Sequence, residues 1–244
     1  MKRTFFIIAA LANITFFIGC SKSDNGTLLP KNDVFVTNAN GVPASANPNS
    51  ATAETYGVTY QLLAVLPPDP LIKWNSGTIT GSELVFDGYQ QWGSSLHDAR
   101  YEVATGRVFN LIAPTNLGKI TVAEGRFYAM DLTMVLGGAN LSPSFYLLGN
   151  FSNAIGINVP VEVIIYDKLK MTGRWTGDVW ILANQHYTGT LILNMAEITL
   201  GITTQMLVNA ERKNGVIKIS PDSNGNLYRL ILDNLQNPLR ADFH

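Results

Sequence analysis

Apolar and polar residues alternate along much of the chain from residue 55 onward. The first such run ends at Pro67-Pro68 and places six side chains on one face: Tyr56, Val58, Tyr60, Leu62, Ala64 and Leu66. A repeat of two residues predicts a half-buried β-strand. A second run, followed by Gly137-Gly138, places five side chains on one face: Tyr128, Met130, Leu132, Met134 and Leu136.

Further alternating runs occur between residues 71 and 219. The stronger ones lie at residues 120–122, 159–165, 179–183 and 187–195, and the weaker ones at 71–74, 83–86, 100–103, 145–149 and 216–219. About ten short strands, separated by Gly, Asn and Pro and with few helical repeats between them, are typical of an all-β protein. We therefore expect residues 54–244 to form an antiparallel β-sandwich of two packed sheets.

Two segments near the C-terminus follow a helical spacing instead. Residues 203–212 form a short amphipathic segment behind Thr203, and a second segment opens at Asp222-Ser223-Asn224 and ends before Pro238. Its apolar residues recur three and four apart, which predicts a short C-terminal helix that covers an open end of the sheet. We interpret the opening residues as a helix cap. A calcium loop is disfavoured because Leu227 stands where such a loop needs glycine.

The N-terminus has the layout of a secretory signal. Lys2 and Arg3 precede an apolar stretch at residues 5–18, which closes on Gly19 and Cys20. Only sixteen residues separate Arg3 from Cys20, whereas a helix that crosses a bilayer needs about 20 mostly apolar residues. Residues 1–19 are therefore expected to be a signal peptide.

The run Phe17-Ile18-Gly19-Cys20 resembles the lipobox of bacterial lipoproteins, with Phe17 in place of the more usual leucine. The resemblance implies cleavage before Cys20 and acylation of Cys20, which anchors a water-soluble domain to a membrane. The chain also loosely resembles uncharacterised surface lipoproteins of the Bacteroidetes. It shares with them a polar segment, a Trp-bearing β domain and a terminal Asn-x-x-Leu-Tyr-x-x-Ile helix. That resemblance implies the cell envelope, at the periplasmic or outer side of the outer membrane.

Residues 20–53 are rich in Ser, Asn, Ala, Pro and Thr, and we expect them to form the lipidated N-terminus and a flexible tether. Residues 34–36 are the one apolar island in this segment. They could instead add an edge strand to the domain.

Charge and cysteine content narrow the function classes. Without residues 1–19 the chain has 15 basic and 18 acidic side chains, a formal charge of −3, so no partner role with nucleic acid is expected. Cys20 is the only cysteine. Once it is acylated, no thiol remains for disulfides, zinc or nucleophilic catalysis.

Few residues suggest a chemical site. His97 and His186 have no second ligand at metal spacing, and no nucleophile motif or flanking carboxylate pair is present. We expect no enzyme activity, no metal and no cofactor. Trp175 and Trp180 flank Thr176-Gly177-Asp178, a turn-like stretch that could hold two rings at a loop rim for stacking on sugars. Core or edge packing is the alternative role for this pair.

The sequence thus favours a membrane-anchored envelope lipoprotein with a non-catalytic binding or assembly module. Its partner would be a glycan or an envelope protein. Two more specific hypotheses are a pilin-like structural subunit and a glycan-binding protein that uses Trp175 and Trp180. The tether has only Lys22 and Lys31 and no Arg, which weakens the first hypothesis, because a pilin-like subunit often carries a basic cleavage site.

The lipid anchor can be tested directly. Cys20→Ser should leave an unprocessed or soluble precursor, because the thioether is the only anchor that the charges and hydropathy allow. Metabolic labelling with a palmitate analogue should mark the wild-type chain alone. Equal labelling of the variant, or no labelling of the wild type, would contradict lipidation.

Overall fold

The computed structural model describes residues 33–36, 55–68, 70–137, 142–152, 156, 158–182, 185–237 and 239–244. The expected signal peptide, Cys20 and most of the expected tether lie outside the described residues. Residues 32–244 form one compact unit, and this unit contains all of the described strands and helices.

The described residues are mostly β, as the alternation predicts. The strands are β1 (Asp33–Val36), β2 (Thr55–Val65), β3 (Ile72–Trp92), β4 (Ser95–Asn110), β5 (Thr115–Ala123), β6 (Gly125–Leu136), β7 (Phe145–Ser152), β8 (Asn158–Ile165), β9 (Leu169–Ile181), β10 (Tyr187–Asn194), β11 (Arg212–Lys213), β12 (Val216–Ile219) and β13 (Leu239–Phe243). The helices are α1 (Met195–Ile198), α2 (Thr204–Val208) and α3 (Gly225–Leu235).

The strands form one mixed sheet, so the expectation of a purely antiparallel sandwich of two sheets is wrong. The order is β11-β12-β8-β7-β3-β6-β9-β13-β10-β2-β5, with β4 paired to β3 and β1 paired to β4. Four pairings are parallel: β1 with β4, β2 with β10, β8 with β12 and β9 with β13. Alternation along a strand reports which side chains are buried, but it carries no information on the direction of the neighbouring strand.

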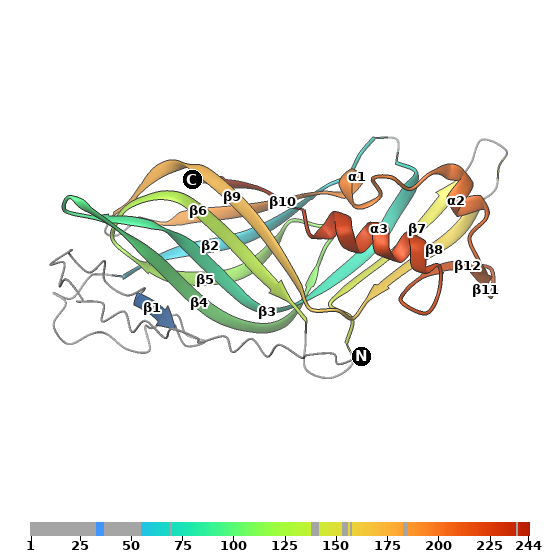
Figure 1. The fold of residues 1–244 in the computed structure, drawn as a ribbon, viewed down its shortest axis with the longest axis horizontal. Helices are drawn as coiled ribbons and strands as arrows, with labels where there is room; N and C mark the ends of the chain where they lie inside the picture. Colours follow the sequence, from blue (N-terminus) through green and yellow to red (C-terminus); the bar gives the residue numbers. More distant parts are fainter. Residues whose placement is uncertain are drawn as a thin grey trace, which may run out of the picture. The chain divides into compact units, whose positions relative to one another are not determined.

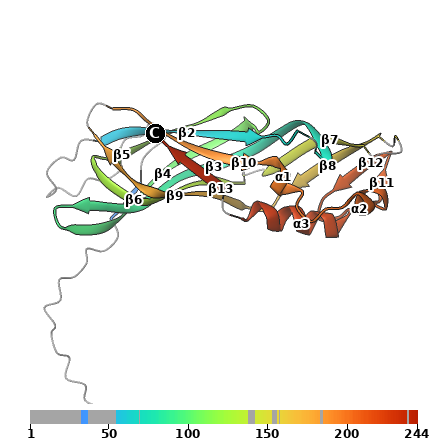
Figure 2. The ribbon, with the colours of Figure 1, turned by 90° about the horizontal axis from the view of Figure 1, so that it is seen from above.

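Strand β3 joins the two ends of the sheet. Its residues 72–79 pair with β7, residues 78–92 pair with β4, and residues 81–91 pair with β6. Figures 1 and 2 show β7, β8 and β12 at one end of β3, together with the three helices, and the remaining long strands curling around the other end. The 21-residue strand β3 thus continues through both ends, so the two ends belong to one sheet and not to two separate sheets.

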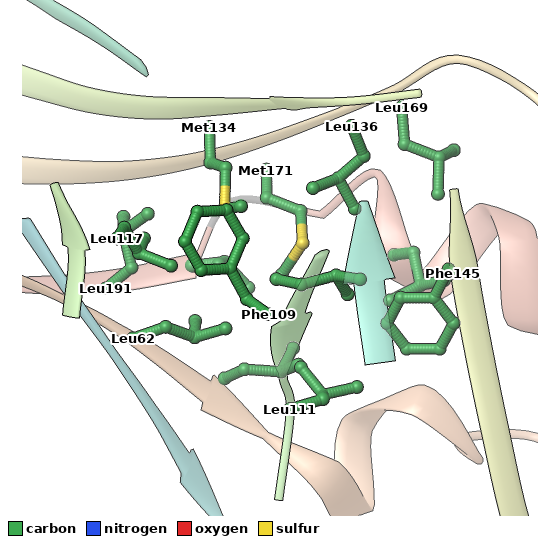
Figure 3. Packing of buried hydrophobic residues seen from close by; sticks show 14 of the residues in the cluster. Leu62, Phe109, Leu111, Leu117, Met134, Leu136, Phe145, Leu169, Met171 and Leu191 are labelled. Carbon is green, nitrogen blue, oxygen red and sulfur yellow. The ribbon is translucent and has the colours of Figure 1, made fainter. Parts of the chain in front are cut away.

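The concave side of the sheet encloses a continuous apolar core. Strand β6 contributes Met130, Leu132, Met134 and Leu136, all fully buried. Figure 3 shows Met134 and Met171 pointing toward Phe109, which comes from β4. The expected face of β2 is found in part: Val58, Tyr60 and Leu62 are buried, whereas Leu66 lies beyond the strand and is exposed. These long runs of buried side chains are the main source of stability.

Both predicted helical segments are helices in the structure. Helix α2 is shorter than expected, and α3 begins without the expected side-chain cap. Helix α2 spans five residues and is capped by Thr203, whose Oγ1 accepts a hydrogen bond from the Met206 amide at 3.2 Å. The expected apolar stripe of the C-terminal helix is Leu227, Tyr228, Ile231, Leu232 and Leu235. Helix α3 buries all of these against the core except Leu232, which is half-buried.

Asn224 does not cap α3 through its side chain, contrary to the cap interpretation. Its backbone is left-handed, with φ 54°. Its Nδ2 donates to the carbonyls of Lys218 at 2.8 Å and Glu211 at 3.0 Å, and its Oδ1 accepts from the Glu211 amide at 2.9 Å. The Asn224 side chain therefore ties the α2–β12 connection to the start of α3.

In the N-terminal segment, Asp33–Val36 forms strand β1 and pairs in parallel with residues 99–102 of β4. The edge-strand alternative therefore describes these four residues, within the segment expected to be a tether.

The packing of α3 predicts a large cost for truncating its buried face. Ile231 is 0% exposed, and Ile231→Ala should lower the free energy of unfolding by about 2–5 kcal/mol, because a cavity remains where the side chain was. Asn226 is exposed, so Asn226→Ala is the matched control on the same helix. Chemical denaturation of both variants measures the difference. Equal midpoints would show that α3 does not contribute to the core.

Candidate functional site

The convex side of strands β4, β3, β6 and β9, here called the outer face, carries an ordered array of polar and aromatic side chains. Along β9, Arg174, Thr176, Asp178 and Trp180 are exposed, whereas Met171 and Gly173 on the opposite side of the strand are buried. The register of the four strands aligns such outward residues in rows that cross the sheet. Directly opposite side chains on one face are close enough to interact.

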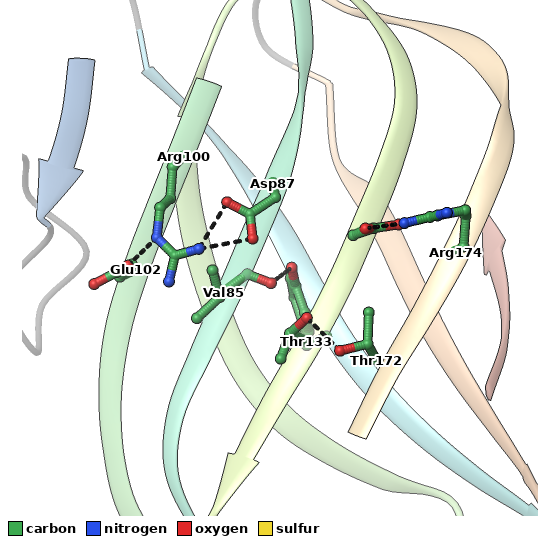
Figure 4. Close-up of polar contacts among 9 residues, drawn as sticks. Val85, Asp87, Arg100, Glu102, Thr133, Thr172 and Arg174 are labelled. Atoms are coloured by element: carbon green, nitrogen blue, oxygen red, sulfur yellow. Dashed lines mark hydrogen bonds and ion pairs between the residues drawn. The ribbon is translucent and has the colours of Figure 1, made fainter. Parts of the chain in front are cut away.

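One row is charged and consists of Arg100, Asp87, Asp131 and Arg174, which are successive Cα partners on β4, β3, β6 and β9. Arg174 donates through Nε to Asp131 Oδ1 and through Nη2 to Asp131 Oδ2, both at 2.8 Å. Arg100 Nη1 donates to both carboxylate oxygens of Asp87, at 2.9 and 3.0 Å (Figure 4). Two neighbouring aspartates are therefore each held by their own arginine.

The electrostatics of Asp87 show that this row is partly withdrawn from water. Burial raises the pKa of Asp87, and this effect outweighs the bonded guanidinium of Arg100, which lowers it. The neighbouring charges of Asp131 and Glu102 raise the pKa further. Arg100 also bonds to Glu102, so a single guanidinium serves two carboxylates on adjacent strands.

The next row is aromatic at its centre and consists of Asp98, Tyr89, Tyr128 and Asp178. Tyr89 is 51% exposed. Tyr128 donates its hydroxyl to Gln91 Oε1 at 2.7 Å. The two rings lie beside each other on the sheet, flanked by a carboxylate on either side.

Arg126 fixes the aromatic groups at the β6–β9 side of this array. Its guanidinium lies 4.7 Å from the centre of the Tyr128 ring and 5.6 Å from that of Trp180, within the range of cation–π attraction. Its Nε donates to Asp178 Oδ2 at 2.9 Å, and this hydrogen bond lowers the pKa of Asp178. Trp180 remains 56% exposed, so its ring is oriented and still open to solvent.

A bulge at Ala129 explains why Tyr128 belongs to this face. Ala129 has a positive φ of 46°, and the β6–β9 register shifts between Tyr128 and Met130. The extra residue in one strand reverses the side to which the following side chains point. Phe127 and Met130 are therefore both buried and Tyr128 faces outward. The prediction that Tyr128 shares a face with Met130 is wrong.

A hollow of about 680 Å³ opens on the outer face at the interrupted register. Its small residues are Gly88, Ala99 and Ala129, and its larger lining residues are Asp87, Tyr89, Asp98, Arg100, Asp131, Arg174 and Thr176. The hollow thus combines an exposed ring with carboxylate acceptors and guanidinium donors at fixed positions.

The structure does not bring Trp175 and Trp180 together. Both lie within strand β9, so Thr176-Gly177-Asp178 is part of a strand and not a turn. Because their positions differ by an odd number, the two rings point to opposite faces. Trp175 packs against the core, and its Nε1 is buried with no hydrogen-bond partner among the described residues. Trp180 alone belongs to the outer face.

Other sequence candidates contribute nothing to this site. His186 is exposed and His97 is half-buried. Within the part of the chain that the structure describes, no three His, Cys, Asp or Glu side chains are grouped closely enough to hold a metal ion. The same residues include no helix with the length and apolar character needed to span a membrane.

Sequence analysis assigned no site role to Tyr89, Arg126 and Tyr128, nor to the four members of the charged row. Tyr89 lies in a stretch with no recognisable alternation beyond residue 86, and Tyr128 is reversed by the bulge. The available signal was the spacing of outward polar residues on β3 and β9, which is informative only once the register between the strands is known.

The outer face also holds a carboxyl pair that makes stability depend on pH. Glu83 on β3 shares a side-chain hydrogen bond with Glu102 on β4. Burial raises the pKa of Glu83, and so do this bond and the charge of Glu102, whereas Arg100 and Lys168 lower it. The folded state therefore releases the Glu83 proton at a higher pH than the unfolded chain, in which the pKa has the ordinary glutamate value of about 4.3.

The resulting stabilisation is complete below the unfolded-state pKa and is lost as the pH rises through the raised folded-state value. Glu83→Gln should raise the melting temperature at pH 7 by a few degrees, on the order of 1–3 °C, and the difference should vanish near pH 4. Glu211→Gln, at an exposed position, is the control with the same change of charge. Thermal melts at both pH values measure the effect. A lower melting temperature for Glu83→Gln at pH 7 would show that Glu83 is ionised and stabilising.

No family model, no curated protein and no solved structure matches this chain. Function therefore has to be argued from the geometry and chemistry of the outer face itself.

Proposed function

We propose that this chain is a lipid-anchored cell-envelope protein whose β domain binds carbohydrate on the outer face, without catalysis. The observation that carries the proposal is the exposed rings of Tyr89 and Trp180 on the same face as the arginine–aspartate row. Among the functions that the sequence favours, a glycan-binding module is the one expected to expose aromatic rings beside charged side chains.

The chemistry of a sugar fits the two kinds of groups on this face. One side of a pyranose ring is lined with C–H groups and stacks on an aromatic ring, whose faces carry negative charge density. The hydroxyl groups at its rim both donate and accept hydrogen bonds. Asp87, Asp98 and Asp131 supply acceptors, and Arg100 and Arg174 supply donors, around one hollow of about 680 Å³.

The side chains are held in place before a ligand arrives. Arg126 bonds to Asp178 and lies over the rings of Tyr128 and Trp180, and Arg174 bonds to Asp131 through two parallel contacts. Groups that are already ordered lose little side-chain entropy on binding, which increases affinity. An exposed array without such contacts would have to be ordered by the ligand.

The same contacts support binding in place of hydrolysis. Glycosidases use one carboxyl group as a proton donor and a second as a base or nucleophile. Here both central carboxylates, Asp87 and Asp131, are engaged by arginine in two-oxygen contacts. The two guanidinium groups thereby hold both carboxylates in fixed positions as hydrogen-bond acceptors for the hydroxyl groups of a ligand.

The envelope location is proposed from the N-terminal resemblance. An acyl anchor at Cys20 would hold the domain at the outer membrane, where polysaccharides are present at the periplasmic or outer side. No cofactor is required for binding of this kind.

Two substitutions at exposed rings test carbohydrate binding. Trp180→Ala and Tyr89→Ala should each lower the affinity for the glycans that the wild-type chain retains on a glycan array by about tenfold. Their melting temperatures should stay near the wild-type value, because both rings are more than half exposed. Tyr166→Ala is the matched control, since Tyr166 is 53% exposed and lies in the β8–β9 connection.

Trp175→Ala separates packing from binding on the same strand. Its half-buried ring packs against the core, so the variant should lose stability on the order of 2 kcal/mol. Calorimetric titration and thermal melts of all four variants provide the comparison. A wild-type chain that binds no glycan on the array, or unchanged affinity in both Trp180→Ala and Tyr89→Ala, would contradict the proposal.

A further inference from the structure

A second hollow lies next to the first on the outer face and differs from it in charge. It has a volume of about 470 Å³ and is lined by Lys168, Leu169, Lys170, Thr172, Arg174 and Gln236. Three of these residues are cationic and none is acidic. The hollow is therefore a concentrated region of positive charge in a domain whose overall charge is negative.

Strand geometry explains the concentration. Residue 168 directly precedes β9, and residues 170, 172 and 174 alternate along its start and face one side, with about 6.6 Å between successive members in the strand. Lys168, Lys170 and Arg174 are exposed. The register adds a further cation, because Arg240 of β13 is the Cα partner of Arg174. The positive groups thus form a line along β9.

The two lysines make no close ion pair, although the charge of Lys168 still lowers the pKa of Glu83. Arg174 bonds to Asp131, and Arg240 forms an ion pair with Asp242. Neither Lys168 nor Lys170 makes an ion pair with another of the described residues. Two positive charges therefore face the hollow without a carboxylate bound to either.

Arg174 lines both hollows, so a polysaccharide that occupies the first hollow can extend into the second. We infer that the hollow at Lys168 and Lys170 receives an anionic group, a carboxylate, sulfate or phosphate, carried by the glycan on the outer face. This inference rests on the proposed function and narrows it to acidic polysaccharides. A lysine ammonium group is a compact positive charge that attracts the oxygens of such anions. Thr172 and Gln236 add polar side chains to the lining of the hollow.

A matched pair of ligands tests the inference on the detergent-solubilised full chain. Oligogalacturonate and its methyl ester share one sugar skeleton and differ in charge. Calorimetric titration should show the acidic form binding about tenfold more tightly, with the preference falling as salt is raised. Lys168→Gln with Lys170→Gln should abolish the preference.

The control is Arg212→Gln with Lys213→Gln, which removes two positive charges from exposed positions on β11. This variant should keep the preference. Equal affinities of the wild-type chain for the two ligands would overturn the inference, and so would a preference that survives in the Lys168/Lys170 variant. Binding to phosphatidylglycerol-doped micelles that depends on these lysines, without a preference for galacturonate, would also overturn it, because the hollow would then recognise a lipid headgroup.

Inorganic phosphate separates this inference from the proposed function. If neither oligosaccharide binds but phosphate shifts the side-chain amine NMR signals of Lys168 and Lys170, the anion site stands and carbohydrate binding fails. If phosphate leaves these signals unchanged as well, the anion site is disproved. Trp180→Ala should bind both oligosaccharides more weakly and keep the charge preference, because Trp180 does not line the hollow at Lys168 and Lys170; loss of the preference in this variant would contradict the inference.

Discussion

Strand β3 is the constraint on which both the core and the outer face depend. Because it is paired along both edges, a slip of one residue would break many backbone hydrogen bonds and exchange its two faces. Its register sends Leu84 and Phe86 into the core and Asp87 and Tyr89 outward. The buried Tyr60 hydroxyl donates to the Val85 carbonyl at 2.7 Å and so fastens β2 to β3 across the interior. Burial raises the pKa of Tyr60, so this donor stays protonated.

The hollow of the outer face arises where the ladder around β3 is interrupted. The β3–β6 register shifts between Asp87 and Tyr89, and the shift faces the bulge at Ala129. A regular ladder would bring large outward side chains into close contact at this point. The interruption leaves Gly88 and Ala129 beside the charged row, and the resulting space is lined by groups that other contacts already hold. Backbone irregularity and side-chain order are thus combined at one place.

The sequence alone predicts the β class, most strand positions and the buried stripe of α3, because these depend on local alternation and spacing. It does not predict the parallel pairing of β2 with β10, since nothing near Val58 identifies Tyr187 as its partner. Tyr128 is misplaced because alanine rarely adopts the left-handed conformation of Ala129. The turn expected between Trp175 and Trp180 is absent, although Gly177 is a residue type common in turns. Gly177 instead lies within β9 and leaves room for the Trp175 ring, whose atoms lie about 2.8 Å from where a Cβ would stand.

The position of β13 has a consequence for how the chain reaches its folded state. Strands β9 and β10 are each paired with β13, which lies between them, and Val58 of β2 finds its partner only at Tyr187 of β10. Contacts between such distant segments make folding slow, because the entropy of closing the loop is lost before the contact forms. During folding, β9 and β10 therefore each keep one open edge until residues 239–243 pair with them. An incompletely folded chain in this condition exposes unpaired strand edges, so pairing with β13 competes with aggregation.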